Sequence, residues 1–273
     1  MPLLDFEKIV QQASPLAEEL CLHLMGEPLF HPEFEEIIQT CESHNTKVQL
    51  TTNGTLIKKY QDFLFSSKMI RQVNFSLQSL AESYPKKLLE THLESILQFS
   101  KEAQTRRPDL YINFRLWNIK NDLEKTQKEN EFFYCFIERD LNLTIKRNID
   151  VGGIKSKKLM NKIYLHFDSR FDWPRYSLPY QGETGRCNAL IDHIAIHSDG
   201  TVVPCCLDDQ ALIPLGNCLN EPLKSILLSS RAIKMKEGFE NGRLVEELCQ
   251  HCTYINRFKK KKRLSTEGSV VVS

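Results

Sequence analysis

The stretch that decides the fold is LHLMGEPLFHPEF, residues 22–34. The apolar segment Leu20–Met25 predicts a buried strand, which must stop at Pro28 because proline lacks the N–H that a strand ladder needs. Pro32 then predicts a helix, since proline suits the first helical turn and the glutamates behind it suit the positive N-terminal end. This explains the prolines, but it leaves open why Gly26 and Glu27 stand where the strand ends.

The following residues alternate between strand-like and helical patterns. Further strand-like runs are Val48–Thr51, Gln72–Leu77, Tyr111–Leu116 and Leu143–Lys146. Helical stretches lie between them; after Tyr84, for example, apolar residues recur at helical spacing from Leu89 to Ser100. Such alternation predicts right-handed crossovers and a parallel sheet, either open or curled into a barrel.

The start of the chain departs from this alternation. Pro2–Ala13 is helical in pattern, so the repeat opens on a helix with no strand before it. We infer that a leading strand and its loop are absent; the alternative is an additional N-terminal helix. Without a leading strand, Leu20–Met25 would present an apolar unpaired edge, which predicts poor solubility unless another segment covers it.

Composition limits the function classes. The chain has 273 residues, a net charge of +1 and 41% hydrophobic residues, which is ordinary for a globular protein. This charge balance argues against nucleic acid and membrane surfaces as partners. There is no apolar run of membrane-spanning length and no secretory signal pattern, so we expect a cytoplasmic protein.

We expect four regions along the chain. Residues 1–150 form the α/β part, 151–181 a bridge, 182–258 a cysteine-rich module and 259–273 a basic, disordered tail. The short KKKKR run of the tail lacks interleaved aromatic residues, which is thin support for RNA binding.

Polar residues stand where the predicted strands end. They are Gly26-Glu27-Pro28, Thr52-Asn53-Gly54, Ser76 with Gln78 and Ser79, and Arg115 with Asn118. In parallel α/β folds, ligands bind at the carboxyl ends of the strands. These ends lie at one edge of the sheet, here called the rim, so polar residues after four strands predict a binding site there. Each of these polar groups, taken alone, has an ordinary structural explanation, such as a turn or the start of a helix.

The nine cysteines are unevenly distributed, with six in the last third of the chain. Cys21, Cys41 and Cys135 stand alone in apolar contexts, which predicts small core residues. The Asp199-Gly200 turn predicts a hairpin that brings Cys187 and Cys205 together.

Cys249-x-x-Cys252 offers two further thiolates. Four thiolates suit either Zn²⁺ or a [4Fe–4S] cluster, and spacing does not choose between them; the four could also be core cysteines that fell together by coincidence. Cys206 and Cys218 are expected to pack, although either could replace a ligand.

These motifs resemble the radical S-adenosylmethionine (SAM) enzymes. MGEP, LTTNGTLI, NFSLQS and FRLWN look like their successive strand ends, and the segment from Cys187 to Cys252 looks like their C-terminal SPASM or twitch module. The resemblance implies an incomplete (β/α) barrel with parallel strands plus this module. It also implies a SAM pocket comprising Gly26, Glu27, Pro28, Thr52, Asn53, Ser76 and Arg115, and one auxiliary [4Fe–4S] cluster on Cys187, Cys205, Cys249 and Cys252.

Two departures from the family qualify the expected function. The 273 residues contain no Cys-x-x-x-Cys-x-x-Cys, the motif that holds the family's catalytic cluster, so we expect the chain as given not to cleave SAM. No cysteine follows Cys252, which resembles the single-cluster version of the module. The resemblance implies an enzyme that modifies a peptide, a protein or a cofactor precursor, with an electron-donor protein as a further partner. The alternative is a non-catalytic iron–sulfur or zinc scaffold.

Overall fold

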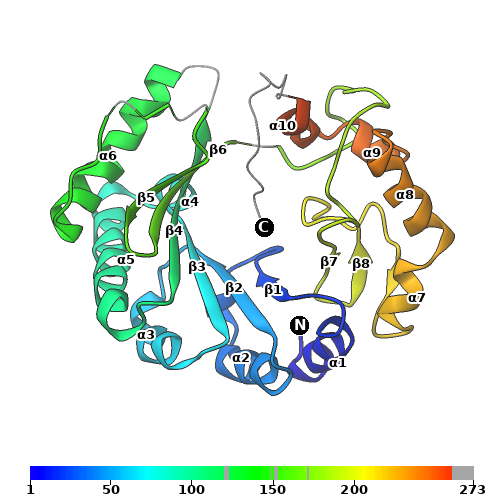
Figure 1. The fold of residues 1–273 in the computed structure, drawn as a ribbon, viewed down its shortest axis with the longest axis horizontal. Coiled ribbons are helices and arrows are strands. Elements are labelled where there is room, and N and C mark those ends of the chain that lie inside the picture. Colours follow the sequence, from blue (N-terminus) through cyan, green and yellow to red (C-terminus); the bar gives the residue numbers. More distant parts are fainter. Residues whose placement is uncertain (120–122, 148, 151–152, 171, 260–273) are drawn as a thin grey trace, which may run out of the picture. The chain divides into compact units, whose positions relative to one another are not determined.

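The computed structural model describes residues 1–119, 123–147, 149–150, 153–170 and 172–259 (Figure 1). It divides into two compact units. The sheet unit comprises Met1–Arg170, Ser198–Gly200 and Cys218–Leu223, and the cysteine unit comprises the remaining described residues. The predicted tail from residue 260 onward lies outside the described residues.

The sheet unit is built from alternating strands and helices. Its strands are β1 (Glu19–Leu22), β2 (Lys47–Thr52), β3 (Ile70–Ser76), β4 (Tyr111–Ile119), β5 (Ser156–Met160) and β6 (Ile163–Ser169). Its helices are α1 (Leu3–Ala13), η1 (Pro28–Phe30), α2 (Phe34–Ser43), α3 (Ile57–Ser66), α4 (Leu77–Ser83), α5 (Lys86–Arg106) and α6 (Leu123–Leu141). The strand order is β1-β2-β3-β4-β6-β5, in which β5 alone runs antiparallel to its neighbour. The predicted α/β fold with a parallel sheet is therefore confirmed.

The two faces of this sheet differ in chemistry. Helices α2, α3, α5 and α6 lie along the outer side of the strands (Figure 1). Apolar residues from alternate strand positions form a core with these helices; Leu50, Phe75 and Phe114, for example, are fully buried. Because strand side chains alternate between faces, the intervening residues lie on the other face, and most of them are polar.

One difference from the sequence predictions concerns the end of the first strand. The first strand ends at Leu22 rather than Met25, and Met25 is 60% exposed. The chain turns away from the sheet there, and Gly26 adopts φ +83°, a conformation that glycine accepts at low cost. Among the described residues β1 pairs only with β2, so it is the edge strand that was predicted.

The predicted strand at Leu143–Lys146 is wrong. The Glu138 carboxylate accepts a hydrogen bond from the Ile145 backbone N–H (2.6 Å) and pairs with Arg147 (2.6 Å). These bonds hold the segment against α6 instead of in the sheet. The parallel neighbour of β4 is β6, which lies with β5 inside the region expected to be a bridge.

The C-terminal part of the chain is mostly loops and short elements. These are β7 (Ala195–Ile196), β8 (Thr201–Val203), β9 (Gly216–Asn217), α7 (Leu223–Leu227), α8 (Ser230–Glu240), α9 (Glu247–Gln250), η2 (Thr253–Ile255) and α10 (Asn256–Lys259). β7 and β8 form the predicted hairpin, with Gly200 at φ +84° in its turn. Met235, Phe239, Leu244 and Leu248 belong to the small core of the cysteine unit. No helix in the described part of the chain is long and apolar enough to span a membrane.

Candidate functional site

The ends of β1 and β2 are joined by the side chain of Glu27. Its carboxylate accepts hydrogen bonds from the Thr52 hydroxyl (2.6 Å), the Asn53 backbone N–H (2.6 Å) and the Leu29 backbone N–H (3.2 Å). Pro28 begins η1 directly behind it. Glu27 therefore fixes the geometry of the rim, and its carboxylate is already engaged by three donors.

The turn after β2 is tightly built. The Asn53 side-chain oxygen accepts hydrogen bonds from the Thr55 backbone N–H (2.9 Å) and hydroxyl (2.8 Å). Gly54 has φ +79°, and a Cβ there would lie 2.5 Å from Cδ1 of Ile96. The glycine lets this turn lie directly against α5. Thr52, Asn53 and Gly54 are therefore fixed in position at the carboxyl end of β2.

The ends of β3 and β4 bring Ser76 and Arg115 together. These two residues are paired in the parallel register, and Arg115 is paired with His166 on β6. The Arg115 guanidinium donates to the Thr51 hydroxyl (3.4 Å) and lies 4.7 Å from the centre of the Trp117 ring. Since β1 to β4 are parallel neighbours, all the predicted rim residues end at the same edge of the sheet.

Sequence reasoning missed His166. Its imidazole is half-buried and has no hydrogen-bond partner within the described part of the chain. Burial lowers the pKa of His166 below its ordinary value, the Arg115 guanidinium lowers it further, and Asp168 acts in the opposite direction. The alternation of apolar and polar residues from Ile163 to Asp168 indicates a strand, and this pattern could have placed His166 on the polar face of the sheet.

The polar face of the sheet is connected by side-chain amides. The Gln72 amide donates to Gln49 (3.0 Å) and to Asn74 (2.9 Å), and the Asn113 amide donates to Asn74 (2.9 Å). Gln49 in turn donates to Glu19 on β1. This network spans four strands and orders the face that carries Arg115 and His166.

In the cysteine unit, the four predicted ligands come from separate short elements. Cys205 follows β8, Cys249 lies in α9, Cys252 immediately precedes η2, and Cys187 lies in the loop before β7. All four are half-buried and pack against the same small apolar core. The fold thus gathers thiols that lie up to 65 residues apart in the sequence around one core.

The pKa values of Cys205 and Cys249 are affected by the other thiols of this set. Burial raises the pKa of Cys205, and the Cys187 and Cys252 sulfurs raise it further. Burial likewise raises the pKa of Cys249, with added contributions from Cys205, Cys187 and Cys252. Burial and the neighbouring sulfurs thus both disfavour the charged thiolate forms of Cys205 and Cys249.

Backbone N–H groups point at three of the sulfurs. The Ala189 N–H donates to Cys187 (3.4 Å), and the Leu207 N–H donates to Cys205. The Tyr254 and Ile255 N–H groups donate to Cys252. Such hydrogen bonds lower the pKa of each of these thiols against the larger effect of burial. Within the described ranges, however, no group of three or more His, Cys, Asp or Glu side chains is arranged to hold a metal ion.

The remaining cysteines divide by environment. Cys41 and Cys218 are buried, and the Cys218 thiol donates to the Gly200 carbonyl (3.3 Å), in keeping with a packing role. The prediction that Cys21 and Cys135 are core residues is wrong, because both are exposed. Cys21 lies on the opposite face of β1 from Leu20 and Leu22. Cys206 is half-buried beside Cys205 and contributes to raising the pKa of Cys205.

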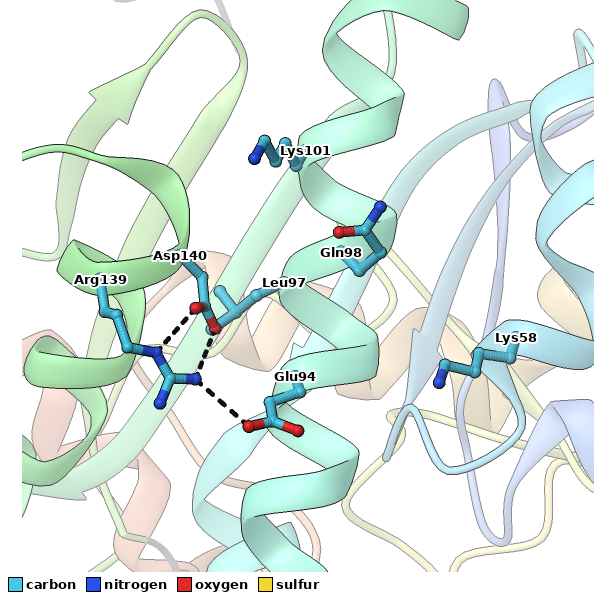
Figure 2. A pocket seen from close by; sticks show the side chains of 7 residues that line it. All are labelled: Lys58, Glu94, Leu97, Gln98, Lys101, Arg139 and Asp140. Atoms are coloured by element: carbon cyan, nitrogen blue, oxygen red, sulfur yellow. Dashed lines mark hydrogen bonds and ion pairs between the residues drawn. The ribbon is translucent and has the colours of Figure 1, made fainter.

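A surface hollow of about 310 Å³ lies among α3, α5 and α6 (Figure 2). Figure 2 shows Arg139 bonded to Asp140 and to Glu94, with Lys58 and Lys101 further out. Its charges are largely paired within the hollow, and its residues belong to the helices rather than to the strand ends. It adds nothing to the candidate site.

Two family models match the chain in order. Residues 1–122 match the radical SAM superfamily, and residues 187–253 match SPASM, an iron–sulfur cluster-binding domain. No curated protein sequence matches the chain.

Among solved structures, Streptococcus suis SuiB bound to S-adenosylmethionine is 17% identical with a TM-score of 0.54, and the alignment covers 96% of this chain and 67% of SuiB. BtrN in complex with AdoMet and 2-DOIA is 13% identical with a TM-score of 0.51, covering 93% of this chain and 80% of BtrN. The anSMEcpe structure with bound AdoMet is 15% identical with a TM-score of 0.51, and the alignment covers 94% of this chain and 78% of anSMEcpe.

At such identities the structural likeness shows the fold alone. The family assignment rests on the two matched domain models, with which the α/β sheet and the cysteine-rich C-terminal region agree. The chain therefore belongs to the radical SAM superfamily and carries a SPASM iron–sulfur cluster-binding domain.

Proposed function

We propose that the cysteine unit holds one auxiliary [4Fe–4S] cluster on Cys187, Cys205, Cys249 and Cys252. The observation that carries this proposal is the convergence of the four thiols on one core, with N–H donors at three of them. When bound, such a cluster supplies one-electron transfer or an anchor for substrate.

Zinc is the less suitable occupant. A single Zn²⁺ at about 2.3 Å from each sulfur needs the thiolates within roughly 3.8 Å of one another. No group of three or more His, Cys, Asp or Glu side chains in the described ranges is arranged to hold one metal ion. Iron is favoured because residues 187–253 match the SPASM iron–sulfur cluster-binding domain.

The test is anaerobic reconstitution of the full chain with iron and sulfide. We expect brown protein with about four iron and four sulfide per chain. Cys249→Ala should lose most of the iron, whereas the matched variant Cys218→Ala, outside the ligand set, should retain it. Full iron content in Cys249→Ala, or a colourless protein that takes up zinc alone, would overturn the assignment.

For the sheet unit we propose a SAM-binding rim. Gly26, Glu27 and Pro28 follow β1 and are tied through the Glu27 carboxylate to Thr52 and Asn53. Ser76 and Arg115 are register neighbours at the ends of β3 and β4. Because the Glu27 carboxylate is engaged within the rim, SAM would contact the peptide carbonyls of this turn through its ammonium group. The side chains of Ser76 and Arg115 would meet its polar oxygens.

We propose that SAM cleavage requires a Cys-x-x-x-Cys-x-x-Cys segment, which these 273 residues do not include. Protein extended with such a segment, reduced and kept anaerobic, should release 5′-deoxyadenosine, while the 273-residue chain should not. A triad-bearing protein that releases none would contradict this part of the proposal. It would favour the second candidate, a non-catalytic scaffold that carries a cluster.

The substrate class that we propose is a peptide or protein, with a cofactor precursor as the alternative, and an electron-donor protein as a further partner. The structure of SuiB bound to its precursor peptide SuiA, which shares this fold, supports the peptide option.

A further inference from the structure

We propose that the sheet unit carries a docking surface for an acidic, extended peptide segment, at the edge of the sheet opposite the rim. This surface lies on the polar face, where the parallel strands have their amino ends. Because the segment would belong to the proposed peptide or protein substrate, its assignment rests on the proposed function. The surface, here called the basic strip, consists of Arg71, Tyr111, Lys158, Lys162 and Tyr164.

A β-bulge directs Arg71 onto the polar face. The register between β2 and β3 shifts at Gln49, which leaves Arg71 as an additional residue of β3. Bulges of this kind change the direction of a side chain. The Arg71 guanidinium forms an ion pair with Glu19, whose carboxylate also accepts a hydrogen bond from the Gln49 amide. Arg71 therefore lies among the polar side chains, with 53% of its side chain exposed.

Tyr111 joins the cations of the basic strip. The Arg71 guanidinium lies 5.9 Å and the Lys162 ammonium 4.4 Å from the centre of its ring, both within cation–π range. The Tyr164 ring lies 6.2 Å from the Tyr111 ring at an interplanar angle of 20°. Lys158 is the register partner of Tyr164, so the two side chains share one face. The basic strip is therefore continuous across β3, β4, β6 and β5.

The positive charge of the basic strip exceeds the negative charge around it. Lys158 is exposed and Lys162 half-buried, and neither forms an ion pair within the described ranges. Two carboxylates of this region have partners of their own. Glu19 is paired with the arginine of the basic strip, and Asp109 is paired with Arg107 (3.0 Å). The two lysines therefore remain available to an anionic partner.

An acidic peptide fits this surface better than a nucleic acid does. Single-stranded nucleic acids bind such surfaces by stacking their bases on aromatic rings. The Tyr111 ring is already contacted by two cations and by Tyr164. Carboxylates need no free ring, and their charge is complementary to that of the basic strip. An extended segment turns every second side chain to the same side, so alternate glutamates can all face the sheet.

The experiment measures fluorescence anisotropy of a labelled peptide of six Glu-Gly repeats on the reconstituted full chain. We expect binding that weakens with added salt, and none for a peptide of six Gln-Gly repeats. Lys158→Gln and Lys162→Gln should each weaken binding about two- to fivefold, as expected for one exposed charge pair, and together about tenfold. Lys128→Gln is the matched control, because Lys128 is an exposed lysine on α6.

Carbodiimide cross-linking then locates the bound peptide. The reagent joins a peptide carboxylate to a neighbouring lysine amine, and mass spectrometry identifies the lysine. We expect cross-links at Lys158 or Lys162. Cross-links confined to the KKKKR run at residues 259–263 would overturn the proposal, because they would show that the peptide binds that run and not the sheet.

Cluster assembly and peptide binding are separate readouts of the same sample. If the cluster assembles and the Glu-Gly peptide does not bind, the docking surface is wrong and the proposed cluster stands. If the peptide binds as expected and no cluster assembles, the reverse holds. An equal loss of binding in Lys128→Gln would overturn the docking surface. So would tighter binding of an oligothymidylate that displaces the peptide, because the surface would then be one for nucleic acid.

Discussion

At the scale of single residues, Glu27 is a structural link between the ends of β1 and β2. The glutamate in the strand-end motif invites a direct ligand role, yet its two oxygens bind Thr52, Asn53 and Leu29. The carboxylate therefore fixes the position of the turn after β1 relative to the end of β2.

Removing the charge of Glu27 should loosen the rim. Hydrogen bonds to charged groups contribute roughly 1.5–3 kcal/mol each, so Glu27→Gln should destabilise the chain by about 1–3 kcal/mol after partial compensation by the amide. Urea unfolding followed by circular dichroism measures this loss. Glu7→Gln, an exposed change on α1, serves as the control. Equal stability of the two variants would show that Glu27 is not a structural link.

The His166 imidazole gives a second prediction at this scale. Removing the Arg115 charge should raise the pKa of His166, because a neighbouring cation disfavours the imidazolium form. Nuclear magnetic resonance titration of the His166 ring in wild type and Arg115→Gln measures the change, with Arg106→Gln on α5 as control. An unchanged pKa in Arg115→Gln would place the guanidinium too far away to act.

The same lowered pKa predicts a pH dependence of stability. The folded state favours neutral His166, so its contribution is complete above the ordinary histidine pKa of about 6.5 and is lost as the pH falls toward the lowered folded value. From pH 7 to pH 5, wild type should therefore lose stability relative to His166→Gln, by at most about 1.4 kcal/mol per pH unit. Parallel pH dependences of the two proteins in urea unfolding would contradict this.

At the scale of elements, periodicity predicted four of the strands because each carries a clear apolar run, as in Tyr111–Leu116 within β4. It failed at Leu143–Lys146, where carboxylate and guanidinium contacts with α6 decide the conformation. It also missed β5 and β6, whose basic and aromatic side chains were taken for an irregular bridge. Tertiary contacts of this kind are not visible in local spacing.

The loop after β8 carries the next prediction. Asp208 is only 2% exposed, and its carboxylate accepts hydrogen bonds from the backbone N–H groups of Leu212 (2.7 Å) and Ile213 (2.8 Å). Asp208→Ala leaves both donors unsatisfied, which costs on the order of 1–3 kcal/mol. Because Cys205 lies three residues earlier, the variant should also bind less iron on reconstitution. The exposed Asp172→Ala is the control, and matching stability and iron content would refute the assigned role.

At the scale of the whole molecule, the order of the two domains could be predicted from the sequence, but the surroundings of the cysteines could not. The hairpin and the Cys-x-x-Cys spacing indicate which thiols converge. The backbone N–H donors at Cys187, Cys205 and Cys252 become neighbours of the sulfurs only through the loops of the folded chain. For this reason the four cysteines could be named from the sequence, whereas the groups around them required the structure.

The division into two units predicts which residues metal binding should protect from hydrogen exchange. A thiolate-bound centre links Cys187, Cys205, Cys249 and Cys252, which otherwise are held only by a small apolar core, so binding should couple to the folding of that unit. Comparing reconstituted and chelator-treated protein by hydrogen–deuterium exchange, we expect protection to fall in residues 187–197, 201–217 and 244–257. Protection in β2, β3 and β4 should stay unchanged, because their larger core is complete without metal. An equal loss in both units would mean that the chain folds as one cooperative body, and unchanged protection in the cysteine unit would mean that the thiols hold no structural centre.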